Sequence, residues 1–354
     1  MTYILIFIIT LTLFFIDKYI IKNFNSLFEK FNLFDQNFIK PQAFHQEPTL
    51  RIGGLLLLIN ITIFLFFNYF LFNFEVSNFF YFLVIFFLIG FLDDLKFLEN
   101  PKLRIMLLIL SIIFLIYFDN ITAPNTGFFF LDKYLNHYLL FKYLFLILCF
   151  LTIINGSNFI DGFNGLLIIH TIIIFFVLLF VNSDFIMNNY LIILILSLLI
   201  LLLFNFPSAN VFLGDSGAYS LGFLTSYLII SISNLYETIS PIFFCILLFY
   251  LFFEVLFSFT RKLIIKKNPL LPDNKHLHML AFNFISKKFN LKNKHANYVT
   301  STIINVIYLI LISPSLLFYE DNYLCKIYFV FCISFYLTLY FLLFFFNKKS
   351  KMFN

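Results

Sequence analysis

Long apolar runs alternate with short polar stretches along the whole chain. Many of the runs reach about 20 residues, the length of helix that crosses the hydrocarbon core of a bilayer. They lack the regular alternation of apolar and polar positions that marks the strands of a membrane β-barrel. The pattern therefore predicts an all-α polytopic membrane protein with about eleven transmembrane helices, near residues 2–22, 49–72, 77–92, 104–118, 138–155, 165–182, 187–205, 217–233, 239–260, 299–318 and 323–346.

The composition supports a membrane protein. Of 354 residues, 62% are hydrophobic and 12% charged, and the mean hydropathy is +0.98, which excludes an ordinary soluble globule. The four cysteines lie within apolar runs without the spacing of metal ligands, so we expect buried thiols rather than disulfides or a metal site. No small-residue cleavage site follows the first run, which indicates a retained helix.

The positions of the basic residues predict the orientation. If the N-terminus lies outside, 20 of the 23 Lys and Arg residues fall in inner loops or flanks, and only Lys133, Lys142 and Lys326 lie outside. This asymmetry follows the positive-inside rule and predicts a basic cytoplasmic loop at 261–298 within a single membrane-embedded domain, 1–354. The net charge of +5 is typical of basic loops beside anionic lipid and requires no nucleic acid partner.

Five polar stretches fall at the predicted inner ends of the spans. They are FHQEPTLRIGG (44–54), GFLDDLKFLENPKLR (90–104), NGSNFIDGFNG (155–165), NVFLGDSGAYSLG (210–222) and PDNKHLHML (272–280). Ionisable groups at membrane depth are costly and usually functional. Although more than two hundred residues separate the first stretch from the last, all five would meet on one face of the membrane.

The carboxylates of these stretches suit phosphate chemistry. Asp93, Asp94, Asp161 and Asp215 would form a hard, oxygen-rich cluster of the kind that holds a divalent cation together with substrate phosphates. The glycines of FLGDSG would leave amides free at a helix N-terminus to meet phosphate oxygens.

Each stretch also has a plainer interpretation on its own. The aspartate pair could be a solvated helix end, DGFNG a helix-ending turn, and HLH a surface pair, while Asp215 or Ser216 could cap a helix. The occurrence of all of them on one face favours a site.

In their order along the chain, the motifs resemble those of the polyprenyl-phosphate N-acetylhexosamine-1-phosphate transferases. The similarity runs from about residue 41 to 280 and includes the family's Asp-Asp, Asn-x-x-Asp-Gly and Phe-x-Gly-Asp-x-Gly motifs and its histidine loop. The sequence departs from the family pattern at Leu50, Asn164, Ala218 and Lys275, where Pro, Asp, Ser, and Arg or Leu are usual. The His-Leu-His loop is closer to the polysaccharide-initiating branch, undecaprenyl-phosphate N-acetylglucosamine-1-phosphate transferase, than to the pentapeptide transferase.

The resemblance implies transfer of N-acetylhexosamine-1-phosphate from a UDP-sugar to undecaprenyl phosphate, with release of UMP, at the cytoplasmic face of the cell (inner) membrane. It implies that Asp161 and Asp215 hold Mg²⁺ or Mn²⁺, and that Asp93 and Asp94 act on the acceptor phosphate, one of them as general base. The substrate-binding residues that it implies are His45, Lys102, Arg104, Asn155, Asn158, Asn164, Phe212, His276 and His278.

Two alternatives stay open at this point. One is a phospho-N-acetylmuramoyl-pentapeptide transferase of peptidoglycan synthesis. The other is a membrane transporter, although transporter sites usually lie near the bilayer midplane between repeated halves and no internal repeat is visible. A homodimer is equally open, and the sequence identifies neither the sugar nor the downstream glycan.

Overall fold

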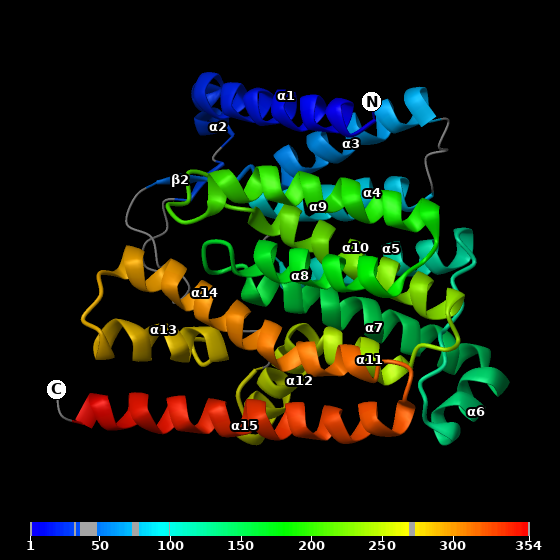
Figure 1. Cartoon of the computed structure of the whole chain (residues 1–354). Coiled ribbons are helices and arrows are strands. Elements are labelled where there is room, and N and C mark those ends of the chain that lie inside the picture. The colour runs from blue at the N-terminus through cyan, green and yellow to red at the C-terminus, as the bar shows by residue number, and fades with distance from the viewer. Residues whose placement is uncertain are drawn as a thin grey trace.

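The fold is a bundle of helices whose long axes run in roughly the same direction (Figure 1). The computed structural model describes residues 2–31, 33–35, 48–72, 78–98, 100–268 and 273–352. The elements are α1 (Thr2–Asn23), α2 (Asn25–Lys30), β1 (Phe34–Asp35), β2 (Thr49–Leu50), α3 (Gly53–Phe72), α4 (Phe79–Asp94), α5 (Pro101–Phe118), α6 (Phe129–His137), α7 (Leu139–Ile160), α8 (Leu166–Val181), α9 (Phe185–Asn205), α10 (Gly214–Leu235), α11 (Pro241–Leu247), α12 (Phe249–Ile264), α13 (Leu277–Lys288), α14 (Asn293–Ile312), the 3₁₀ helix η1 (Ser313–Leu317) and α15 (Asn322–Met352).

The predicted class, an all-α polytopic membrane protein, is confirmed. Eight helices of the described chain are long and apolar enough to cross a membrane, and α11 with α12 makes a ninth if the two count as one bent span. Each of the eleven predicted ranges coincides with one helix or with this pair. Because α4 and α8 have only 16 residues each, the count of eleven crossings stays a prediction.

The two ends of the bundle carry different elements (Figure 1). β2, the start of α10, α13 and the end of α15 gather at one end, which we call the site end, whereas α6 lies at the opposite end. α1 runs towards the site end, and α15 returns to it after the last turn of the chain. The polar stretches of the sequence can therefore be sought at a single end.

The second predicted span begins later than its apolar pattern indicates. Its first residues, Thr49–Leu50, form β2, which pairs antiparallel with β1, and Leu50 also bridges Val211 in parallel register. The Phe212 amide donates to the Leu50 carbonyl at 2.7 Å, and the Gly53 amide donates to the Phe212 carbonyl at 2.9 Å. These backbone groups are bonded to the α9–α10 connection, so the helix starts only at Gly53.

The predicted span at 239–260 is bent. α11 and α12 meet at Leu248 with an angle of 75° between their axes. Ser240 caps α11 through the Ile242 amide, and Pro241 occupies its first turn, as both residues commonly do at helix starts. The break itself could not be predicted, because no Gly or Pro stands near Leu248.

Glycines bring the helices of the site end into backbone contact. A Cβ atom at Gly90 on α4 would overlap the Asp215 carbonyl, and one at Gly54 on α3 would overlap the Gly217 amide nitrogen. The start of α10 is thus packed directly against the main chains of α3 and α4. This packing brings the Asp-Asp motif of α4 to the motif that opens α10.

Candidate active site

The start of α10 is held by a carboxylate from another helix. Asp94, the last residue of α4, accepts from the Asp215 and Ser216 amides, both at 2.9 Å, and only 1% of Asp94 is exposed. Gly214 adopts a left-handed φ of +76°, and a Cβ there would lie 2.8 Å from the Asp94 carboxylate. The expectation that these amides are free for phosphate is therefore wrong for Asp215 and Ser216. Asp94 satisfies donors that a helix N-terminus otherwise leaves open.

Asp215 itself does not cap its helix. No side chain caps α10 from the position before its first residue, and the Asp215 carboxylate instead accepts a hydrogen bond from the Asn158 amide group on α7. Asn158 and Asp215, from two motifs 57 residues apart, therefore meet at this point. The plain interpretation of Asp215 as a helix cap does not apply.

Asp93 and Arg104 form an ion pair beside this contact. Asp93 is the last residue but one of α4. Arg104 lies in the first turn of α5, where Asn100 caps the helix through the Lys102 amide. The Lys102 side chain is exposed. The Asp-Asp motif thus presents one carboxylate paired with a guanidinium and another committed to helix amides.

Asp161 follows α7 and lies within electrostatic reach of the same carboxylates. Burial raises its pKa well above the usual range, and the charges of Asp215 and Asp94 raise it further, while Arg51 opposes them. The residues that the structure describes provide no hydrogen bond to its carboxylate. Asp161 is therefore a carboxylate short of positive partners.

Arg51 is a residue of the site that the sequence interpretation counted only as a basic residue. Its guanidinium donates to Asp35 at 2.5 Å and lies within electrostatic reach of Asp94 and Asp215. β2 and its backbone bonds to the α9–α10 connection bring it there. Its place two residues before the Gly-Gly pair of the first motif was the available signal.

Three predicted substrate-binding residues make contacts within the fold. Asn155 donates to the Leu151 carbonyl of its own helix at 2.7 Å. Asn164 is 7% exposed, and its side chain donates to the Pro207 carbonyl at 2.9 Å. Phe212 is partly buried, and its main chain pairs with residues 50–53. His45 lies outside the described residues.

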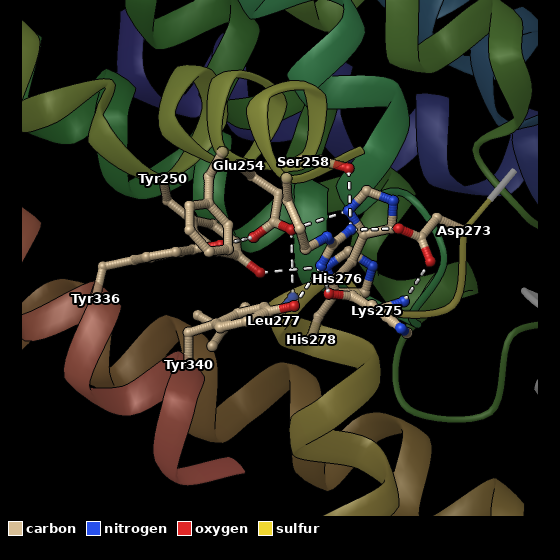
Figure 2. A network of polar contacts seen from close by, with 12 residues as sticks. Tyr250, Glu254, Ser258, Asp273, Lys275, His276, Leu277, His278, Tyr336 and Tyr340 are labelled. Atoms are coloured by element: carbon tan, nitrogen blue, oxygen red, sulfur yellow. Dashed lines mark hydrogen bonds and ion pairs between the residues drawn. The ribbon is translucent and has the colours of Figure 1, made fainter. Parts of the chain in front are cut away.

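The two histidines of the last motif lie in a separate, buried network (Figure 2). His276 Nδ1 lies 2.9 Å from Glu254 Oε1, and His278 Nδ1 lies 3.2 Å from the Tyr250 hydroxyl. His276 is 2% exposed and His278 is fully buried. Burial, with the charge of His276, lowers the pKa of His278 to about 3, so its imidazole is neutral at physiological pH.

The histidine network packs against the segment that carries Asp161. The His276 ring lies 5.1 Å from the Phe159 ring and the His278 ring 5.4 Å from the Phe163 ring, centroid to centroid. Glu254, the network's carboxylate, was missed by the sequence interpretation. A lone glutamate inside an apolar run was the signal that could have found it.

The donor chemistry at the start of α10 fits a divalent cation. Across the described parts of the chain, no three His, Cys, Asp or Glu side chains form a ready-made metal site. Mg²⁺, however, commonly binds one or two carboxylates and completes its shell with water and substrate phosphates. Asp161 and Asp215 offer such carboxylates. Burial is the main cause of the raised pKa of Asp161, and the charges of Asp215 and Asp94 add to it, a repulsion that a bound cation would relieve.

These features define an integral membrane protein whose acidic and basic side chains meet where several helices end, as phosphate-transferring enzymes require. The family description "Glycosyl transferase family 4" matches residues 76–233. An undecaprenyl-phosphate alpha-N-acetylglucosaminyl 1-phosphate transferase of Thermotoga maritima is 30% identical over 295 residues, 81% of this chain and 80% of the relative. A phospho-N-acetylmuramoyl-pentapeptide-transferase of Streptococcus pneumoniae serotype 2 is 28% identical over 193 residues, 51% of this chain and 58% of the relative.

The chain belongs to glycosyl transferase family 4 and is a membrane-embedded phosphotransferase of its glycosyl-1-phosphate transferase type. The resemblance that the motifs predicted is confirmed.

Proposed function

We propose that this protein transfers an N-acetylhexosamine-1-phosphate group from a UDP-sugar to undecaprenyl phosphate and so initiates synthesis of a cell-surface polysaccharide. The observation that carries the proposal is the meeting of three motifs at the start of α10, where Asp94 and Asn158 bond residues of the FLGDSG stretch and Asp161 lies within electrostatic reach. The Thermotoga relative, similar over most of both chains, favours this acceptor and an N-acetylglucosamine donor.

The reaction is a displacement at phosphorus. A phosphate oxygen of the acceptor forms a bond to the β-phosphorus of the UDP-sugar, and the bond from that phosphorus to the bridging oxygen breaks, which releases UMP. Phosphate monoesters have a second pKa of about 6, so the attacking oxygen is largely deprotonated at neutral pH. The protein's main tasks are therefore positioning and charge neutralisation.

The described residues divide these tasks. Arg104 and Arg51 are each paired with one aspartate, Asp93 and Asp35 respectively, and each can exchange it for a substrate phosphate. Asp93, once released by Arg104, is the carboxylate able to accept a proton from the acceptor. Asp161 and Asp215 would hold Mg²⁺, which when bound would neutralise the pyrophosphate charge.

We place the site on the cytoplasmic face of the cell membrane. The support is the basic residues of the loops that join the site-end helices, as in the 261–298 segment. The two substrates support it as well, because a prenyl chain lies in lipid while a nucleotide sugar arrives from water.

The test is a reconstituted assay. Purified protein in lipid nanodiscs is incubated with undecaprenyl phosphate and, in separate reactions, UDP-N-acetylglucosamine, other UDP-N-acetylhexosamines and UDP-N-acetylmuramoyl-pentapeptide, and UMP release is followed. We expect release with a simple UDP-N-acetylhexosamine. Release with the pentapeptide donor alone would assign the protein to peptidoglycan synthesis, and no release with any donor would overturn the proposal.

A further inference from the structure

Glu254 is a buried carboxylate with three donors. It lies on α12 and is 1% exposed. Its Oε1 faces His276 Nδ1 at 2.9 Å and accepts from the Leu277 amide at 3.3 Å, while its Oε2 accepts from the Tyr336 hydroxyl at 2.6 Å (Figure 2). A buried carboxylate is stable only with such partners.

The contact with Glu254 fixes one nitrogen of His276. Because the Glu254 carboxylate accepts from His276 Nδ1, that nitrogen carries a proton in both the neutral and the charged ring. Nε2 is left for a ligand, and it donates to an anion when the ring is protonated. The bond from the Leu277 amide to the same oxygen also ties the start of α13 to α12. Glu254 therefore sets both the tautomer and the orientation of His276.

The two histidine rings lie parallel to each other. The rings of His276 and His278 are parallel within 2° and 5.5 Å apart, centroid to centroid. His278 Nε2 is buried and has no hydrogen-bond partner in the described part of the chain. An unpartnered buried polar atom costs free energy, and a ligand that bonds it recovers this cost.

Two tyrosines of α15 and an arginine of α12 also belong to the network. Tyr336 bonds Glu254, and Arg261 bonds the Tyr340 hydroxyl, the Lys275 carbonyl and the Asp273 carboxylate. Because Lys275 directly precedes His276, these bonds hold the entry of the histidine loop against α12 and α15 (Figure 2).

We propose that Glu254 is a positioning residue for the transfer reaction, acting through His276 so that the Nε2–H of the protonated ring donates to an anionic phosphate group of the substrates. The proposal rests on the function proposed above. It differs from a purely structural role, in which Glu254 would only join α12, α13 and α15.

The test compares Glu254→Gln, His276→Ala and the double variant in nanodiscs. Loss of the carboxylate behind a metal-ligating histidine typically costs about 10- to 100-fold. We expect a fall of similar size in kcat for Glu254→Gln, with a smaller change in KM. If Glu254 acts through His276, Glu254→Gln causes no further loss in the His276→Ala background. The proposal would be overturned if the loss in the double variant equalled the product of the two single losses. Unchanged kcat in a well-folded Glu254→Gln protein would also overturn it.

A second readout does not depend on turnover. In ¹⁵N-histidine-labelled protein, the His276 signals, assigned by their absence in His276→Ala, should show a protonated Nδ1 that Glu254→Gln alters. Glu237→Gln, which removes an exposed carboxylate in the connection before α11, is the matched control and should leave these signals unchanged. If the wild-type protein releases no UMP, the proposed function fails, while the tautomer measurement still decides the role of Glu254 at His276.

Discussion

Two aspartates that meet at the start of α10, Asp94 from the end of α4 and Asp215 from α10 itself, have different partners. Asp94 bonds two main-chain amides and is almost fully buried, whereas Asp215 is partly exposed and bonds the side chain of Asn158. Removal of either charge is expected to lower activity, whereas it is the loss of the Asp94 carboxylate that leaves the Asp215 and Ser216 amides without their acceptor. Stability and activity therefore respond differently at the two residues.

For Asp215→Asn, we expect UMP release to fall at least about a hundredfold, because electrostatic groups at reacting phosphates contribute about 3 kcal/mol or more. The thermal unfolding temperature should stay close to that of the wild type, because the start of α10 is capped by the side chain of Asp94 rather than by that of Asp215. Wild-type turnover by a normally expressed Asp215→Asn protein would remove Asp215 from the catalytic site.

For Asp94→Ala, we expect a clear loss of stability. The Asp215 and Ser216 amides lose their acceptor inside the protein, and buried unpaired donors cost about 1–3 kcal/mol. Asp94→Asn keeps one acceptor oxygen and should lose less. Thermal unfolding in detergent measures both changes, and equal stability of the Asp94→Ala and wild-type proteins would show that the cap is dispensable.

At this scale the sequence singled out the carboxylates of the motifs, but it did not indicate what each one contacts. Asp94 and Asp215 were found because ionisable residues are rare in apolar runs. The bond between them joins residues 121 positions apart, and no local pattern encodes it. Glu254 stands alone in its run, and its histidine partner lies 22 residues further on.

At the scale of elements, helices were predicted well and their ends less well. Apolar length locates a membrane helix, but its ends depend on caps and on pairing with distant segments. Residues 49–50 were included in the predicted span, and yet they pair with β1 and Val211. α6 and α13 were not predicted as helices, because one is only nine residues long and the other stands in a loop rich in charge.

The contact between α4 and α10 predicts a steric sensitivity at Gly90. In Gly90→Ala the added methyl group meets the main chain of Asp215 and Ser216, which cannot turn aside as a side chain can. Overpacking typically costs about 1–3 kcal/mol. We expect a lower unfolding temperature and reduced UMP release. Gly162→Ala is the control for stability, because a Cβ there has no atom within 4 Å, and similar unfolding of both variants would contradict the packing argument.

The carboxylates supplied by the end of α7 and the start of α10 predict a metal requirement. In excess EDTA we expect UMP release to stop, and added Mg²⁺ should restore it, because the phosphates of both substrates bring further negative charge to Asp161 and Asp215. Turnover at the full rate in EDTA would rule out the cation.

At the scale of the whole molecule, the bundle predicts which segments face each side of the membrane. Asn293 at the start of α14 and Asn125 before α6 are both exposed, and an odd number of crossings places them on opposite sides. With the native cysteines replaced, a cysteine at 293 should react with an impermeant thiol reagent only from the cytoplasm and one at 125 only from outside. The reverse pattern would overturn the orientation.

The overall architecture was predictable because a bilayer leaves the chain few choices. Lipid contains no partners for backbone polar groups, so apolar runs of this length become helices. The gathering of the motifs at one end followed from simple alternation of the spans. The bend at Leu248 was not predictable in this way, because it depends on how α11 and α12 pack against α15 and α7.

The carboxylate of Asp94 has a practical consequence for inhibitors. An anionic compound that aims at the amides of α10 competes with a group that the fold tethers to them, and tethering gives such a group an effective concentration in the millimolar range or above. Adding a second negative charge to a compound should therefore improve its affinity little at this point. A head group that brings its own cation, or that bonds the Asn158–Asp215 pair directly, has no such internal competitor.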